Sequence, residues 1–200
     1  MQSAEIEVKF PVADSAALQS RLPPLGFHLE TQRTFEHNTL YDTPARDLRE
    51  RRQILRLRKY GDLCILTHKR MPENADDSRY KTRIETETLV GDCGALAEVF
   101  RQLGYTPAFT YEKFRTEWSY PLSGSDVHAH LVIDETPIGT WAELEGPTGW
   151  IDRTLEDLDI DPASCITDSY GALFNQWKQS SGSSAANLTF DEIAPTLASR

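Results

Sequence analysis

Acidic and basic side chains alternate with apolar ones at a spacing that could hold a phosphate chain. Near the start of the chain, Glu5, Glu7 and Lys9 share one face of a strand, because successive side chains of a strand point to opposite faces. In the same way, Arg56 and Arg58 face away from two leucines. Arginine and lysine donors suit phosphate oxygens. Carboxylates suit hard divalent cations such as Mg²⁺ or Mn²⁺, which in turn bridge phosphate oxygens.

The same alternation recurs along most of the chain. The further charged faces comprise Arg79, Lys81, Arg83, Glu85 and Glu87; Lys113, Arg115 and Glu117; Asp134; and Glu143 with Glu145. For any single strand, the simplest interpretation is a polar face in solvent. Both signs of charge recur on nearly every strand, however, and the apolar faces need helices to cover them. Because a charged interior is costly unless its charges are paired or bind a ligand, the pattern predicts a polar tunnel for a highly charged substrate and its counter-ions.

Period-two patterning dominates the chain and predicts the strands that would position these charges. The predicted strands are 4–11, 27–42, 53–60, 62–70, 79–90, 109–121, 127–135 and 139–146. The predicted helices are 14–22 with Asp14 as N-cap, 45–52, 94–103 with Asp92 as N-cap, and 168–178. The predicted fold class is α+β and mainly β: an antiparallel barrel or strongly curved sheet with helices packed outside.

Composition limits the classes of function. The chain has 200 residues and a formal charge of −10, which disfavours binding to nucleic acid or to an anionic membrane. We expect one domain over 1–178 and a Ser-rich, mobile tail over 179–200. The start has no signal-peptide pattern, and the cysteines, Cys64, Cys93 and Cys165, are far apart. We therefore expect no disulfide framework and a cytoplasmic protein.

An ordered series of motifs resembles the CYTH superfamily of triphosphate tunnel metalloenzymes. It begins with Glu5-Ile6-Glu7-Val8-Lys9 and continues through Tyr41-Asp42-Thr43, Leu55-Arg56-Leu57-Arg58, Leu66-Thr67-His68-Lys69-Arg70, Arg83-Ile84-Glu85-Thr86-Glu87, Glu112-Lys113-Phe114-Arg115, Ile133-Asp134-Glu135, the stretch 139–146 and Ser169-Tyr170. The resemblance covers residues 3–178. It implies an eight-stranded antiparallel β-barrel that encloses a tunnel, and a metal-dependent enzyme that hydrolyses or cyclises triphosphates.

The resemblance also implies roles for individual residues. The residues expected to bind phosphate are Lys9, Arg56, Arg58, Lys69, Lys113 and Arg115. Those expected to hold Mg²⁺ or Mn²⁺ are Glu5, Glu7, Asp134, Glu143 and Glu145. Lys69, Glu85 and Glu87 are the candidate catalytic residues, the two glutamates as groups that position metal or nucleophile.

Three functions remain open at this point. The first is a hydrolase of inorganic tripolyphosphate or a small organic triphosphate. The second is a class IV-type adenylate cyclase, and the third is a non-catalytic module that binds nucleotide or polyphosphate. Animal thiamine triphosphatases carry a lysine where this chain has Ser169, which weakens an assignment to thiamine triphosphate. The expected partner is a small triphosphate, with no nucleic acid and no membrane, and a homodimer stays open.

Overall fold

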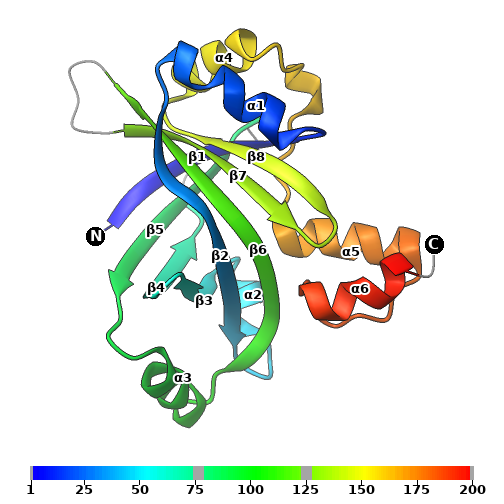
Figure 1. Ribbon diagram of the computed structural model, residues 1–200. Helices are drawn as coiled ribbons and strands as arrows, with labels where there is room; N and C mark the ends of the chain where they lie inside the picture. Colours follow the sequence, from blue (N-terminus) through cyan, green and yellow to red (C-terminus); the bar gives the residue numbers. More distant parts are fainter. Residues whose placement is uncertain (1, 74–78, 123–127, 199–200) are drawn as a thin grey trace.

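Eight antiparallel strands close into a barrel in this computed structural model, which describes residues 2–73, 79–122 and 128–198. The strands are β1 (Gln2–Pro11), β2 (His28–Asp42), β3 (Ile54–Tyr60), β4 (Leu63–Arg70), β5 (Lys81–Leu89), β6 (Thr106–Pro121), β7 (His128–Thr136) and β8 (Gly139–Glu145). Around the barrel their order is β1-β5-β4-β3-β2-β6-β7-β8, and β1 closes the sheet by pairing with both β5 and β8 (Figure 1). The predicted fold class is confirmed.

Six α-helices and two short 3-10 turns flank the barrel in the described part of the chain. They are α1 (Ser15–Arg21), η1 (Pro23–Leu25), α2 (Asp47–Glu50), α3 (Cys93–Gln102), α4 (Thr148–Asp157), η2 (Pro162–Ser164), α5 (Tyr170–Ser181) and α6 (Phe190–Ala198). Asp14 and Asp92 each accept a backbone hydrogen bond at 2.9 Å and begin α1 and α3, as predicted. The sequence analysis does not predict α4 and α6.

The apolar faces of the strands lie outside the barrel, beneath helices. Val8 of β1 and Leu144 of β8 belong to one buried cluster with Leu18 of α1 and with Ile151 and Leu155 of α4. In Figure 1, α1 and α4 lie together at one end of the molecule, next to β1, β7 and β8. The helices therefore cover the apolar faces of the strands from outside the barrel. The opposite faces, which point into the barrel, carry the charged side chains.

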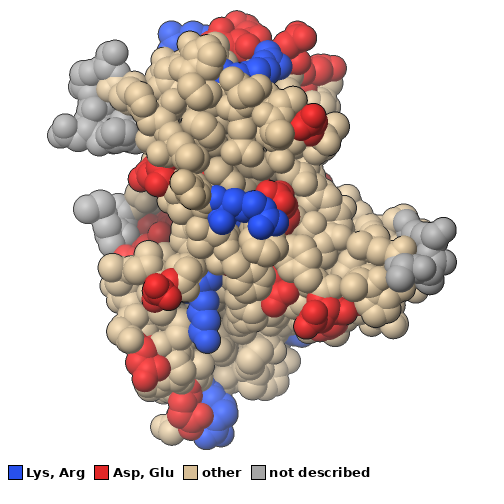
Figure 2. All heavy atoms as spheres, viewed as in Figure 1, with Lys and Arg blue, Asp and Glu red and all other residues tan. Residues whose placement is uncertain are grey.

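Charged side chains lie both on the surface (Figure 2) and in the interior. Figure 2 shows acidic and basic side chains together at the end of the molecule where α4 lies. Four of the predicted phosphate-binding residues are buried: Lys9, Arg56, Lys113 and Arg115. Among the described helices, none combines the length and the apolar character that crossing a membrane requires.

The segment predicted as a mobile tail is packed onto the barrel in the structure. After α5 ends at Gly182, the chain returns along β6, where the Leu188 N–H donates to the Thr110 carbonyl at 3.0 Å and the Leu188 carbonyl accepts from the Glu112 N–H at 2.9 Å. Leu188 and Ile193 are fully buried. The structure thus corrects the expectation, because these two apolar side chains find a surface on the barrel that composition does not reveal.

A disulfide links Cys64 of β4 to Cys93, the first residue of α3, with their Cα atoms 5.8 Å apart. The argument from cysteine spacing against disulfides is therefore wrong for this pair, while Cys165 is free. The two partners are 29 residues apart in the sequence, and docking of α3 on the outside of β3 and β4 brings them together. The bond ties α3 to the barrel.

Removal of this bond is expected to destabilise the fold. Replacing Cys64 and Cys93 by serine should lower the free energy of unfolding by about 3 kcal/mol, because the crosslink restricts the unfolded chain over a loop of this length. Urea unfolding with and without dithiothreitol measures the effect, and Cys165→Ser serves as the control that keeps the crosslink. An unfolding midpoint that dithiothreitol leaves unchanged in the wild type would contradict the prediction.

Candidate active site in the barrel

The barrel encloses a cavity of about 320 Å³ whose wall is mostly charged. Its charged lining residues are Glu5, Glu7, Lys9, Glu30, Arg56, Arg58, Lys69, Lys81, Glu85, Glu87, Lys113, Arg115, Glu117, Glu143 and Glu145. Of the residues predicted for the site, only Asp134 is missing from this wall, since it is fully buried behind other side chains. The alternation of charges along the strands therefore predicts the lining of one internal cavity.

Strand register explains which acids meet. In the β1–β8 pair, Lys9 lies opposite Glu143 and Glu7 lies opposite Glu145. In the β1–β5 pair, Glu5 lies opposite Arg83. Directly opposite side chains of antiparallel strands are near neighbours on the same face. The register therefore pairs one glutamate of β8 with a lysine and leaves the other beside a second glutamate.

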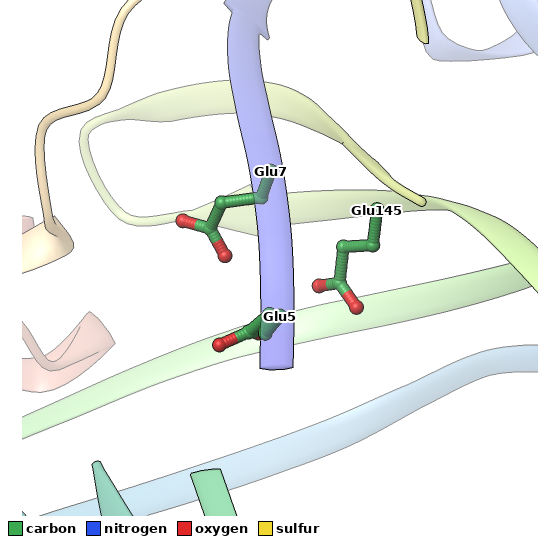
Figure 3. A group of neighbouring side chains, drawn as sticks. All are labelled: Glu5, Glu7 and Glu145. Atoms are coloured by element: carbon green, nitrogen blue, oxygen red, sulfur yellow. The ribbon is translucent and has the colours of Figure 1, made fainter. Parts of the chain in front are cut away.

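Three carboxylates converge where β1 meets β8. One oxygen each of Glu5, Glu7 and Glu145 lies within 4.8 Å of the other two, and Figure 3 shows the three side chains approaching one another. Burial raises the pKa of Glu145 to about 8, and repulsion from Glu5, Glu7 and Glu143 adds to this. Carboxylate oxygens are the ligands that hard divalent cations prefer, and a cation between these three groups would relieve their repulsion, so the residues fit Mg²⁺ or Mn²⁺.

Two of the three glutamates of this acidic group, Glu5 and Glu7, each lie next to a lysine. Lys69 Nζ lies 2.6 Å from Glu5 Oε2 and 3.0 Å from Glu85 Oε2, and Lys81 donates to Glu7. Burial disfavours the charged form of Glu5, yet attraction and hydrogen bonding to Lys69 lower its pKa overall. Glu145 has no lysine or arginine within salt-bridge distance in the described residues, which leaves it the least compensated carboxylate of the three.

Arg56 and Arg58 of β3 lie on the cavity wall. The Arg56 guanidinium donates to Tyr111 Oη at 3.2 Å and to Thr67 Oγ1 at 3.1 Å, and it lies 3.3 Å from Glu87 Oε1. The Nε atoms of Arg56 and Arg58 are buried without a hydrogen-bond partner in the described structure. Because a buried donor without a partner is unfavourable, these atoms are suited to an anion that enters the cavity.

Asp134 and Glu143 hold cations in place and do not join the acidic group at Glu145. Asp134 accepts two hydrogen bonds from Arg115 at 2.7 Å and one from Lys113 at 2.8 Å. Glu143 accepts from Lys9 and from Arg115 Nη2, the latter at 3.0 Å. Their oxygens have cationic partners, as those of Glu5 and Glu7 also do, and the metal-binding role that the resemblance implies for Asp134 and Glu143 stays a prediction. Glu143 and Glu145 lie on the same face of β8, so the alternation of side chains along the strand does not show which of them binds cationic side chains and which joins the acidic group.

The candidate catalytic glutamates of β5 lie side by side. Burial raises the pKa of Glu85 to about 7, against the attraction of Lys69, and repulsion from Glu5 and interaction with Glu87 act in the same direction as burial. Attraction to Arg58 and a hydrogen bond from Thr67 overcome burial and lower the pKa of Glu87. The two neighbours therefore differ in proton affinity, a separation typical of acid–base sites.

The sequence analysis assigns no role to three further residues of the site, although Tyr170 appears there in the motif Ser169-Tyr170. Glu36 of β2 is fully buried 3.5 Å from Lys113 Nζ and 3.7 Å from Arg58 Nε, and the nearby cations lower its pKa against the effect of burial. Tyr111 and Tyr170 contribute aromatic rings to the wall. Glu36 lies within a predicted strand, but it belongs to no motif. The one signal for it in the sequence is a charged side chain in a strand whose neighbours in the barrel also carry charges.

Comparison with known proteins identifies the family. The CYTH domain model matches residues 3–158. The chain belongs to the CYTH family. The match ends after α4, so the CYTH domain as matched supplies all eight strands, whereas α5 and α6 lie beyond it.

Relatives of this CYTH protein carry names of two activities. A protein of Methanocaldococcus jannaschii named "Putative adenylate cyclase" is 27% identical over 176 residues, which are 83% of this chain and 95% of the relative. A Vibrio parahaemolyticus structure of a putative adenylate cyclase has a TM-score of 0.66 at 17% identity, covering 86% of this chain and 97% of that one. A Hippeastrum protein, described as a putative adenylyl cyclase with a dominant triphosphatase activity, has a TM-score of 0.60 at 21% identity over 88% and 96% of the two chains. The two solved structures show that the fold is shared.

Proposed function

We propose that this protein is a metal-dependent hydrolase of inorganic tripolyphosphate or a small organic triphosphate. One observation supports the proposal most strongly: a single cavity within the barrel combines arginine and lysine donors with three converging carboxylates. Phosphoryl transfer requires mainly positioning and neutralisation of charge, and this wall provides both. An apolar ligand carrier would instead have an apolar interior.

The residues divide the work by charge. Glu5, Glu7 and Glu145 would hold Mg²⁺ or Mn²⁺. When bound, such a cation neutralises phosphate oxygens and favours attack by water. Arg56 and Arg58 present guanidinium donors to the phosphate chain, and Lys9 of β1 and Lys113 and Arg115 of β6 add positive charge. Three further residues of the cavity wall would transfer protons and position the water: Lys69, Glu85 and Glu87.

Adenylate cyclase activity is the second candidate, because the Methanocaldococcus relative carries that name. In a cyclase, the 3′-hydroxyl of ATP attacks the α-phosphorus and pyrophosphate leaves, whereas in a hydrolase water attacks a phosphoanhydride. The same cradle of charges serves both reactions. The Hippeastrum protein favours the hydrolase as first choice, since the cyclase name there accompanies a dominant triphosphatase activity.

A product analysis distinguishes these functions. The purified protein is incubated with Mg²⁺ or Mn²⁺ and with tripolyphosphate, thiamine triphosphate or ATP in turn. Orthophosphate release is the expected result, whereas cyclic AMP with pyrophosphate would identify a cyclase. Tight binding without turnover of any of the three would overturn the hydrolase and leave a binding module.

The requirement for metal is expected to depend on pH. Below the pKa of Glu145, which is about 8, its carboxyl holds a proton that a cation must displace. The Mg²⁺ concentration for half-maximal activity should therefore fall as pH rises from about 7 to about 9 and then level off, because the group is then already ionised. In Glu145→Gln this pH dependence should flatten. Equal slopes in the variant and the wild type would contradict the prediction.

A further inference from the structure

Tyr170, the first residue of α5, contacts three charged groups of the site although it lies beyond the matched CYTH domain. Its hydroxyl donates to Asp134 Oδ2 at 2.6 Å. Its ring lies beneath two ammonium groups, with Lys9 Nζ at 4.2 Å and Lys113 Nζ at 4.9 Å from the ring centroid. The negative face of an aromatic ring attracts cations at these distances.

Neighbouring elements fix the position of this ring. The Ser169 side chain caps α5 by accepting from the Ala172 N–H at 3.2 Å. The rings of Tyr111 and Trp141 lie 5.9 and 6.1 Å from the Tyr170 ring. Burial, Asp134 and Glu143 raise the pKa of Tyr170, so its hydroxyl stays protonated and remains a donor. The tyrosine therefore has one orientation relative to the cavity.

The C-terminal segment holds α5 to the strand that carries two of the cations. The returning chain pairs with β6 through Leu188, and Glu112 Oε2 accepts from the Phe190 N–H at 3.0 Å. Lys113 and Arg115 follow Glu112 on that strand. In Figure 1, α5 and α6 lie next to each other on one side of the barrel. The helix that supplies Tyr170 is thus fastened at both of its ends.

We propose that Tyr170 is a positioning residue that orients Lys9 and Lys113 for the phosphate chain. Lysine has a flexible side chain, so an ammonium group needs a fixed partner to keep one place. Beside the carboxylates of Glu143 and Asp134, the ring is a second partner that both lysines share, and the hydroxyl holds Asp134, which in turn binds Lys113 and Arg115. The inference rests on the proposed function and adds the C-terminal helix to the working parts of the site.

Steady-state kinetics with tripolyphosphate at saturating Mg²⁺ test this role in the full-length protein. Tyr170→Leu should raise KM about tenfold with a smaller change in kcat, and Tyr170→Phe, which keeps the ring, should restore KM to within about threefold of the wild type. Phe174→Leu is the matched control, because Phe174 is a buried ring on the same helix whose ring and cation contacts in the described structure are with Phe109, Trp177 and Lys178, none of them a charged residue of the cavity wall. It should lower the melting temperature and leave KM unchanged.

A nearly isosteric comparison keeps the test independent of folding. Phenylalanine at position 170 is compared with 3,4,5-trifluorophenylalanine, whose ring has a weaker negative face. The fluorinated protein should have the higher KM, and equal KM values would overturn the inference, as would a Tyr170→Leu variant that behaves like Phe174→Leu. A wild type that neither binds nor hydrolyses tripolyphosphate, thiamine triphosphate or ATP overturns the proposed function and the inference together, whereas an active wild type with unresponsive variants overturns the inference alone.

Discussion

Arg56→Ala is expected to lower kcat/KM for tripolyphosphate by about 30- to 1000-fold, which corresponds to about 2–4 kcal/mol of lost transition-state stabilisation. The Arg56 side chain is buried on the cavity wall, and its Nε has no hydrogen-bond partner in the described structure. A guanidinium in that position can bind phosphate oxygens with a planar pair of donors, away from bulk water. Steady-state kinetics at saturating Mg²⁺ measure the effect.

Two variants show whether that loss belongs to the site. Arg33→Ala removes an arginine that is half-exposed on the outside of the barrel and paired with Glu135, so it should leave kcat/KM unchanged. Arg56→Lys keeps the positive charge without the planar pair of donors, and its activity should fall between those of Arg56→Ala and the wild type. A folded Arg56→Ala protein with wild-type turnover would remove Arg56 from the proposed site.

The fold and the cavity lining could be predicted because both depend on a local pattern. Alternation of charged and apolar residues fixes which side chains share a face, and eight such stretches have only a few ways to bury their apolar faces. Lys113 and Arg115, for example, are placed on the inner face by parity alone, and Trp118 on the outer one. Side-chain parity survives an error of two residues in a strand's boundary, so the prediction tolerates inexact ends.

The features that sequence could not supply depend on contacts between distant segments. Glu143 and Glu145 have the same parity, and only the β1–β8 register decides that Glu143 faces Lys9 while Glu145 joins Glu7. The helix α4 was missed because its buried residues stand among acidic and small ones, and the packed tail was missed because two apolar residues, Leu188 and Ile193, carry its docking. Each of these features depends on contacts between segments that are far apart in the sequence, and composition does not contain that information.

The compensation of charge within the cavity follows one principle. Asp134 and Glu143 each bind two of the cations Lys9, Lys113 and Arg115, so that these charges satisfy one another and stay in place without a ligand. Glu145 is different, since burial and neighbouring acids raise its pKa. The site is therefore held rigid by its paired charges and is left incomplete at the acidic group, where a cation would relieve the repulsion.

Glu7→Gln is expected to raise the Mg²⁺ or Mn²⁺ concentration for half-maximal activity by about 10- to 100-fold. The substitution keeps the shape of the side chain but removes one of the three carboxylates, and affinity for a hard cation depends strongly on the number of charged oxygen ligands. Activity measured across a metal titration reports this shift, and maximal activity at very high metal should recover in part. Calorimetric titration of the metal alone provides a second measurement that needs no substrate.

The control for this substitution is Glu98→Gln, which makes the same chemical change on the exposed surface of α3, where Glu98 pairs with Arg101. It should leave the metal titration unchanged, because screening by solvent and salt isolates it from the cavity. Glu7 also accepts a hydrogen bond from Lys81, so Lys81→Met is the variant that separates loss of this ion pair from loss of a metal ligand. If Lys81→Met shifted the metal titration upward as far as Glu7→Gln does, Glu7 would act through its lysine, and the acidic group of Glu5, Glu7 and Glu145 would lose its place as the metal site.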